Sequence, residues 1–292
     1  MYETKIQHPA VSNKVEKGLT VLLYGHPGTW KTTWCAQWPG VVFISIVSEG
    51  GDAALTSYPT IAKWLVDNAS TKDIPPVFNT SEPQKFPVRT TKEFVDYIEL
   101  ICKNRKQWGI CTVVVDGLTQ LIDIWKREYI HLKQADRNYT QRSDKRGGDL
   151  LDQQAWGFLN LFLSTARVDL QNHGLNVIWT TFLKEVWSPP DPKGNQDLIA
   201  ELPMITGANR VTLPAQCQLW LYAKREKTPD MKVPGTYSVQ PRYLTKSTGT
   251  ADLRHKFLWK FPKGCLMDPD FGTLPTFRSI YYELHEHIYL GQ

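Results

Sequence analysis

The sequence predicts an α/β fold in which a mainly parallel central sheet is flanked by helices and continued by antiparallel strands toward the C-terminus. Apolar strand-like segments and helical segments alternate four times before residue 185. That order is typical of a parallel sheet with helices on both faces. A glycine-containing turn joins the first strand to the first helix and is the second observation. The four buried strands are expected at residues 19–24, 41–47, 111–115 and 175–181.

Composition is that of an ordinary globular protein. The chain has 292 residues, of which 41% are hydrophobic and 22% are charged, enough to bury a substantial core. We expect an N-terminal arm at 1–18, a core at 19–223, and C-terminal strands and a helix at 224–292 packed on the core. The net charge of +5 permits a nucleic-acid partner but does not require one.

The first turn carries the most specific motif of the chain. Residues 25–32, here called the phosphate loop, fit the pattern G-x-x-x-x-G-K-[ST] except at Trp30, where glycine is usual. Strand, tight turn and helix direct backbone N–H groups toward an anion. Lys31 is expected between the β- and γ-phosphates of a nucleotide, and the Thr32 hydroxyl at Mg²⁺. The predicted ATP-binding residues are Gly25, His26, Pro27, Gly28, Thr29, Trp30, Lys31, Thr32 and Thr33.

Trp30 leaves three possibilities open. The indole could pack over the bound base, pack against a neighbouring subunit, or distort the loop. Nucleotide binding is therefore a firmer expectation than fast hydrolysis.

Two carboxylates follow predicted strands. Asp116 comes directly after the strand at 111–115, which matches the strand end that organises Mg²⁺ beside a phosphate loop. Glu49 comes soon after the strand at 41–47, in the crevice where parallel sheets bind ligands. Lys31, Glu49 and Asp116 are the candidate catalytic residues, and Thr32 and Asp116 the candidate metal ligands.

The remaining segments are assigned by helix signals and helix breakers. Four prolines within 71–89 predict an exposed loop. Thr90 and Glu93 form a capping-box pattern that starts a helix reaching Trp108. Further helices are expected at 118–133, 149–173 and 277–290, with Gly174 as a helix stop. Strands are expected at 218–223, 236–246 and 253–261.

Two polar segments are candidate loops. Residues 134–148 contain four basic residues and could be a solvated loop or a DNA-contacting loop. Residues 185–197 are rich in proline and polar residues and are expected to form a second loop that could contact DNA phosphates or bases.

Cysteines and apolar runs bear on location. The five cysteines form no C-x-x-C pair, so reduced thiols in a cytoplasm are expected. No apolar run has the length of a membrane span, and the first residues lack the apolar region of a signal peptide. We therefore expect a cytoplasmic protein without a membrane partner.

The order of these motifs resembles the phage-encoded P-loop ATPases with a RecA-like core, a family that includes AAA-type nucleotide-binding proteins and single-strand annealing recombinases. The resemblance covers about residues 18–262. It implies ATP binding between subunits of a ring or filament, assembly on single-stranded DNA, cooperation with a single-strand-binding protein, and a location in the host cytoplasm. The segments that carry it are 25–32, 49–51, 113–116, 156–157, 177–181 and 202–207.

The same resemblance suggests roles for individual residues. Glu49 would polarise the attacking water, although it could instead be a charge near a helix N-terminus. Thr180 and Thr181 would lie where a polar residue senses the γ-phosphate. Arg254 and Lys256 could reach a neighbouring subunit's ATP or face solvent on a strand edge.

The leading hypothesis is an ATP-binding, ATP-hydrolysing RecA-like protein that acts on single-stranded DNA in phage recombination or replication. The alternative is a nucleotide-dependent switch or assembly ATPase with a protein partner, such as a helicase loader or virion-assembly factor. A third reading is a protein that binds nucleotide without turnover because of Trp30.

Overall fold

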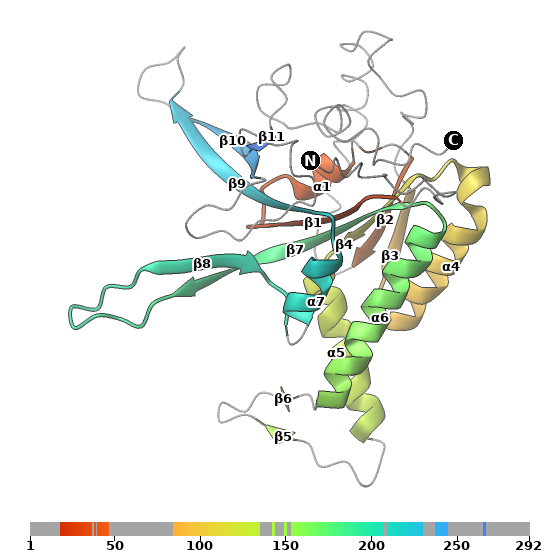
Figure 1. Cartoon of the computed structure of the whole chain (residues 1–292), viewed down its shortest axis with the longest axis horizontal. Helices are drawn as coiled ribbons and strands as arrows, with labels where there is room; N and C mark the ends of the chain where they lie inside the picture. Colours follow the sequence, from red (N-terminus) through yellow and green to blue (C-terminus); the bar gives the residue numbers. More distant parts are fainter. Residues whose placement is uncertain are drawn as a thin grey trace, which may run out of the picture.

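The computed structural model describes residues 18–36, 38, 40–46, 84–134, 142–143, 149–150, 153–206, 209–229, 237–244 and 265–266. Its central feature is a nine-stranded sheet with helices packed against it (Figure 1). The strands are β1 (Thr20–Gly25), β2 (Val41–Ile46), β3 (Gln84–Val88), β4 (Thr112–Asp116), β7 (Asn176–Trp187), β8 (Leu198–Pro203), β9 (Leu219–Pro229), β10 (Tyr237–Leu244) and β11 (Cys265–Leu266). The helices are α1 (Lys31–Cys35), α4 (Thr91–Trp108), α5 (Leu118–Gln134), α6 (Gln153–Asn172) and α7 (Asn209–Gln216). A separate two-stranded ribbon joins β5 (Arg142–Ser143) to β6 (Asp149–Leu150).

The sheet order is β11-β10-β9-β1-β7-β4-β2-β3, with β8 paired to β7. Strands β9, β1, β7, β4, β2 and β3 run parallel, whereas β10, β11 and β8 pair antiparallel. The predicted α/β fold with a mainly parallel sheet and an antiparallel extension is therefore confirmed. Because β7 lies between β1 and β4 and runs parallel to both, the carboxyl ends of these three strands lie together at one edge of the sheet.

Alternate side chains of the central strands enter two different cores. On one face, Leu22 of β1 and Val113 of β4 pack with α4, α5 and α6. On the other face, Val21 and Leu23 of β1 pack with Trp34 of α1. Continuous apolar strands are expected where both faces of a sheet are covered.

The helix predicted from the capping box is present as α4. The Thr90 hydroxyl accepts from the Glu93 N–H at 3.1 Å, and the Glu93 carboxylate accepts from the Thr90 N–H at 3.2 Å. At the other end, Gly109 adopts a left-handed conformation and stops the helix. Both ends of α4 are therefore fixed by local sequence.

Replacing Thr90 by alanine is expected to lower the free energy of unfolding by about 1 kcal/mol, because an N–H in the first turn loses its acceptor. Urea unfolding of the wild type and Thr90→Ala measures the loss. Thr90→Ser keeps the hydroxyl and should unfold near the wild-type midpoint. Equal midpoints for all three proteins would contradict a stabilising role for the cap.

Four sequence assignments were wrong in part. The end of the segment expected to be a loop at 71–89 forms β3, because Pro87 lies on the edge strand of the sheet, where its missing N–H costs no ladder bond. The helix expected from Asp149 begins at Gln153, because Asp149 and Leu150 pair with Arg142 and Ser143. Helix α7 was missed because Pro214 lies inside it.

The fourth correction concerns residues 185–197. They were expected to form a loop, but β7 runs on to Trp187 and pairs with β8. The resulting β7–β8 hairpin extends away from the rest of the sheet (Figure 1). Its tip is ordered by Asp191, whose carboxylate accepts from the N–H groups of Lys193 and Asn195, both at 2.8 Å.

The strands expected at 19–24, 41–47, 111–115, 175–181, 218–223 and 236–246 all have counterparts. The strand expected at 253–261 and the helix at 277–290 lie outside the described residues, as does the expected arm up to residue 17.

Candidate functional site

The candidate site lies at the carboxyl ends of β1, β4 and β7. Gly25 ends β1 opposite Phe182 of β7, and Asp116 ends β4 opposite Thr180 of β7. The phosphate loop leaves β1 at this edge, so the sheet brings together the loop and Asp116, which are far apart in the sequence. Ligands bind at this edge in open α/β sheets.

Two glycines give the loop its path. A Cβ at Gly25 would lie 2.2 Å from the Ala223 carbonyl oxygen on β9, so the close approach of the two strands requires glycine. Gly28 has φ of 70°, in the left-handed region that favours glycine. These positions match the predicted loop.

Lys31 folds back over the loop. Its ammonium donates to the carbonyl oxygens of Gly25 at 3.0 Å and His26 at 2.9 Å, and it lies 5.6 Å from the Phe182 ring centroid. The positive charge is thereby held beside the turn where a phosphate group would sit. Thr29 supports the turn, since its hydroxyl donates to the His26 carbonyl at 2.8 Å.

A chain of hydrogen bonds joins the loop to β4 and β7. The Thr32 hydroxyl donates to one carboxylate oxygen of Asp116 at 2.9 Å, and the Thr180 hydroxyl donates to the other at 2.7 Å. Thr180 also accepts from the Gly117 N–H at 3.0 Å. Asp116 is only 4% exposed. Its carboxylate and the Thr32 hydroxyl are oxygen ligands of the kind Mg²⁺ prefers, so these residues fit the predicted metal site.

Cys35 lies beneath the loop and is fully buried. Burial is the main cause that raises the pKa of its thiol well above the usual range; the nearby Asp116 charge raises this pKa further, and Lys31 lowers it. A neutral, buried thiol is a poor nucleophile. Cys35 therefore contributes packing to the site, not chemistry.

The structure places Trp30 and adds a residue that sequence reasoning missed. Trp30 has φ of 58° and ψ of 26°, and is the one non-glycine residue with positive φ in the described part of the chain. The guanidinium of Arg225 lies 5.9 Å from the Trp30 ring centroid. Arg225 carries no motif, and only the sheet register, which places β9 beside β1, could have pointed to it.

A second link runs from the loop to the β7–β8 hairpin. The His26 Nε2 atom lies 3.2 Å from a carboxylate oxygen of Glu185 on β7.

Thr181, beside Thr180, shares a hydrogen bond of 2.8 Å with the Thr119 hydroxyl. The hydroxyls of Thr180 and Thr181 thus both contact protein groups.

The other predicted residues fall into two groups. Within the described residues, Thr33 is buried on α1 and Gly25 to Thr32 form one continuous turn into that helix. Glu49, Arg254 and Lys256 lie outside the described residues, so their roles stay predictions.

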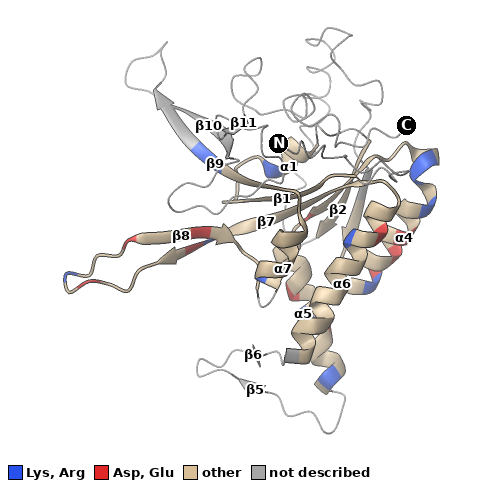
Figure 2. Ribbon diagram, viewed as in Figure 1, with Lys and Arg blue, Asp and Glu red and all other residues tan. Residues whose placement is uncertain are grey.

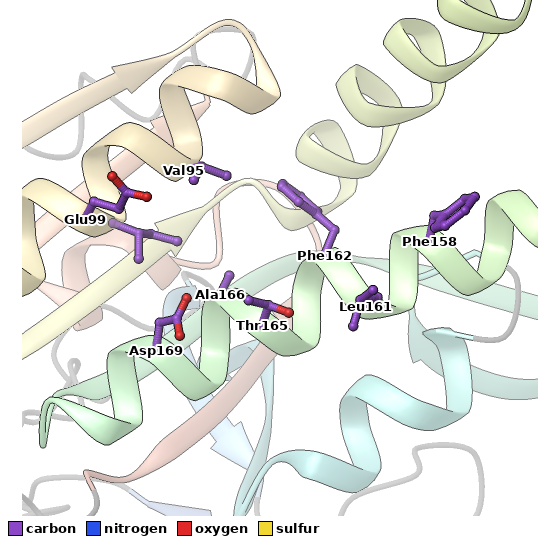
Figure 3. A pocket seen from close by; sticks show the side chains of 9 residues that line it. Val95, Glu99, Phe158, Leu161, Phe162, Thr165, Ala166 and Asp169 are labelled. Atoms are coloured by element: carbon purple, nitrogen blue, oxygen red, sulfur yellow. The ribbon is translucent and has the colours of Figure 1, made fainter.

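A separate hollow lies on the outer face of α4 and α6. This α4–α6 groove has a volume of about 280 Å³ and is mainly apolar, with Glu99 of α4 and Asp169 of α6 at one end (Figure 3). It contains no phosphate-loop residue. Two carboxylates would repel a nucleotide's phosphates, so the groove is not the nucleotide site.

The fold and this site define a class, the P-loop nucleotide-binding proteins. A parallel sheet, a phosphate loop after β1 and an acidic residue at the end of β4 are its parts. The family model described as "AAA domain" matches residues 17–248, and the chain belongs to that family. No curated protein sequence matches the chain. Among the helices that the structure describes, none has the length and apolar character needed to span a bilayer.

Proposed function

We propose that the protein is a Mg²⁺-dependent ATPase. The observation that carries the proposal is the contact between Thr32 and Asp116 at 2.9 Å, directly beside the loop on which Lys31 lies. The Thr32 hydroxyl and the buried Asp116 carboxylate would supply oxygen ligands for the metal ion, as in other phosphate-loop enzymes. The bound metal would neutralise charge on the β- and γ-phosphates.

The protein's own groups would perform the rest. Backbone N–H groups of the phosphate loop and the Lys31 ammonium would hold the phosphate oxygens. Thr180 keeps the Asp116 carboxylate oriented through its 2.7 Å hydrogen bond. Glu49, which follows β2 in the sequence, would orient the attacking water.

We further propose that ATP binding is coupled to single-stranded DNA in phage recombination or replication, with ATP between the subunits of a ring or filament. Support comes from the resemblance, the net charge of +5 and the basic residues of segment 134–148, which would contact DNA phosphates. A single-strand-binding protein would be a further partner. The basic residues of the segment are Arg137, Arg142, Lys145 and Arg146.

The β7–β8 hairpin favours a second candidate function, a nucleotide-dependent switch with a protein partner. Trp187 and Ile199 on the hairpin are 48% and 54% exposed. Residues 184–201 contain two lysines but four acidic residues, and both signs appear along the hairpin (Figure 2). Exposed apolar side chains without a positive surplus suit a protein surface better than a phosphate backbone.

One experiment tests both candidates. ATP hydrolysis by the purified protein is measured with and without single-stranded DNA, at several salt concentrations, beside Glu49→Gln. We expect Mg²⁺-dependent hydrolysis that single-stranded DNA stimulates and that is lost in Glu49→Gln. Because DNA binding through phosphates weakens with salt, the stimulation should fall steeply as the salt concentration rises. Hydrolysis without any DNA response would favour the protein-partner switch. Nucleotide binding without hydrolysis under any condition would contradict the ATPase proposal.

A further inference from the structure

Arg225 reaches the phosphate loop because β9 is longer than its neighbour. Strand β1 ends at Gly25, opposite Ala223 of β9, and β9 continues past that point. Arg225 is two residues beyond Ala223 and therefore lies beside the turn itself. No functional motif predicts this position.

The guanidinium makes three contacts with the loop. Its Nε donates to the Gly28 carbonyl at 2.9 Å, and one Nη donates to the Pro27 carbonyl at 3.3 Å. Its central carbon lies 5.9 Å from the Trp30 ring centroid. The same Nη atom would lie 2.0 Å from a Cβ at Gly28, so glycine at this position also makes room for Arg225.

These contacts lie at and beside Trp30, the one loop residue other than glycine that has a positive φ. Tryptophan in the left-handed region is costly, because its Cβ crowds the backbone. The loop pattern places glycine there, which adopts this conformation freely. An arginine whose guanidinium lies over the indole and donates to the Pro27 and Gly28 carbonyls offsets part of that cost.

We propose that Arg225 is a positioning residue that holds Trp30 in the left-handed conformation and so keeps the phosphate loop in its nucleotide-binding shape. The proposal rests on nucleotide binding at this site. It explains how the chain accommodates tryptophan where glycine is usual. Arg225 acts through Trp30 and need not contact phosphate.

The test is a double-mutant cycle on the full chain. ATP dissociation constants are measured by titration calorimetry for the wild type, Arg225→Ala, Trp30→Gly and the double variant. Arg225→Ala should weaken ATP binding about tenfold, and the double variant should bind within about twofold of Trp30→Gly. Arg225→Lys should also lose affinity, because an ammonium lacks the planar, delocalised guanidinium that lies over the Trp30 ring while it donates to the Pro27 and Gly28 carbonyls.

Lys224→Ala is the matched control. Lys224 is the exposed neighbour of Arg225 on β9, and its replacement should leave the dissociation constant unchanged. An equal loss from Arg225→Ala in both backgrounds would overturn the proposal, since Arg225 would then act without Trp30. No loss from Arg225→Ala in the wild-type background would overturn it as well.

Thermal unfolding of the same four proteins separates this proposal from the proposed function. Arg225→Ala should lower Tm by about 3 °C when Trp30 is present and by clearly less in the Trp30→Gly background. If the wild type binds no nucleotide, the function fails, but this Tm coupling still decides whether Arg225 supports Trp30. Equal Tm shifts in both backgrounds would overturn the positioning role.

Discussion

Replacing Lys31 by alanine is expected to reduce kcat/KM for ATP by roughly 10²–10³, the effect of removing one preorganised donor from a developing charge. The ammonium of Lys31 is a positive charge that the loop itself holds in place, through the Gly25 and His26 carbonyls. Without it, the loop loses the one ammonium among its own side chains, and its backbone N–H groups and hydroxyls are neutral donors. Binding of ATP by calorimetry and its hydrolysis by phosphate release measure the loss.

Lys92→Ala is a suitable control for this variant. Lys92 is an exposed lysine on α4 that pairs with Asp96 at 2.5 Å, and α4 packs on the face of the sheet opposite to α1. Its removal changes the net charge by the same amount and should leave ATP binding unchanged. A Lys31→Ala protein that binds and hydrolyses ATP like the wild type would contradict the proposed site.

Replacing Asp116 by asparagine is expected to reduce the kcat of Mg²⁺-dependent hydrolysis by roughly 10²–10³. The buried carboxylate accepts from both Thr32 and Thr180. Asparagine keeps the shape of the side chain but removes the negative charge that would help bind a divalent ion. The measurement is the ATPase rate as a function of Mg²⁺ concentration.

The paired control is Asp123→Asn. Asp123 lies on α5, where its carboxylate is 3.3 Å from Lys126, and it is exposed. That variant should hydrolyse ATP at the wild-type rate and show the same Mg²⁺ dependence. Wild-type Mg²⁺ dependence in Asp116→Asn would remove Asp116 from the metal site.

Much of the fold could be predicted because local patterns coincide with burial. The apolar strands β1, β2 and β4 need no information from distant residues, and neither does the start of α4 at its capping box. Strand β3 and helix α7 could not be predicted, because Pro87 and Pro214 read locally as breakers. Their tolerance depends on an edge position and on packing.

The β7–β8 hairpin was predicted to be a loop for a related reason. Residues after Phe182 leave the covered part of the sheet, and their burial changes from buried to mainly exposed. The apolar pattern that indicates a strand therefore fades, although the backbone continues as one. Its partner strand β8, and not its own composition, keeps it extended.

The sequence by itself determined where the phosphate loop, Lys31, Thr32 and Asp116 stand in the chain, because the chemistry proposed for them depends on residue type at fixed spacing. Only the tertiary structure decided how these parts meet. Strand β7 lies between β1 and β4 and supplies Thr180 to Asp116, and β9 carries Arg225 to the loop at Trp30. Sheet order depends on contacts between residues far apart in the chain. The residue pattern within one strand therefore does not determine which strand will pair with it.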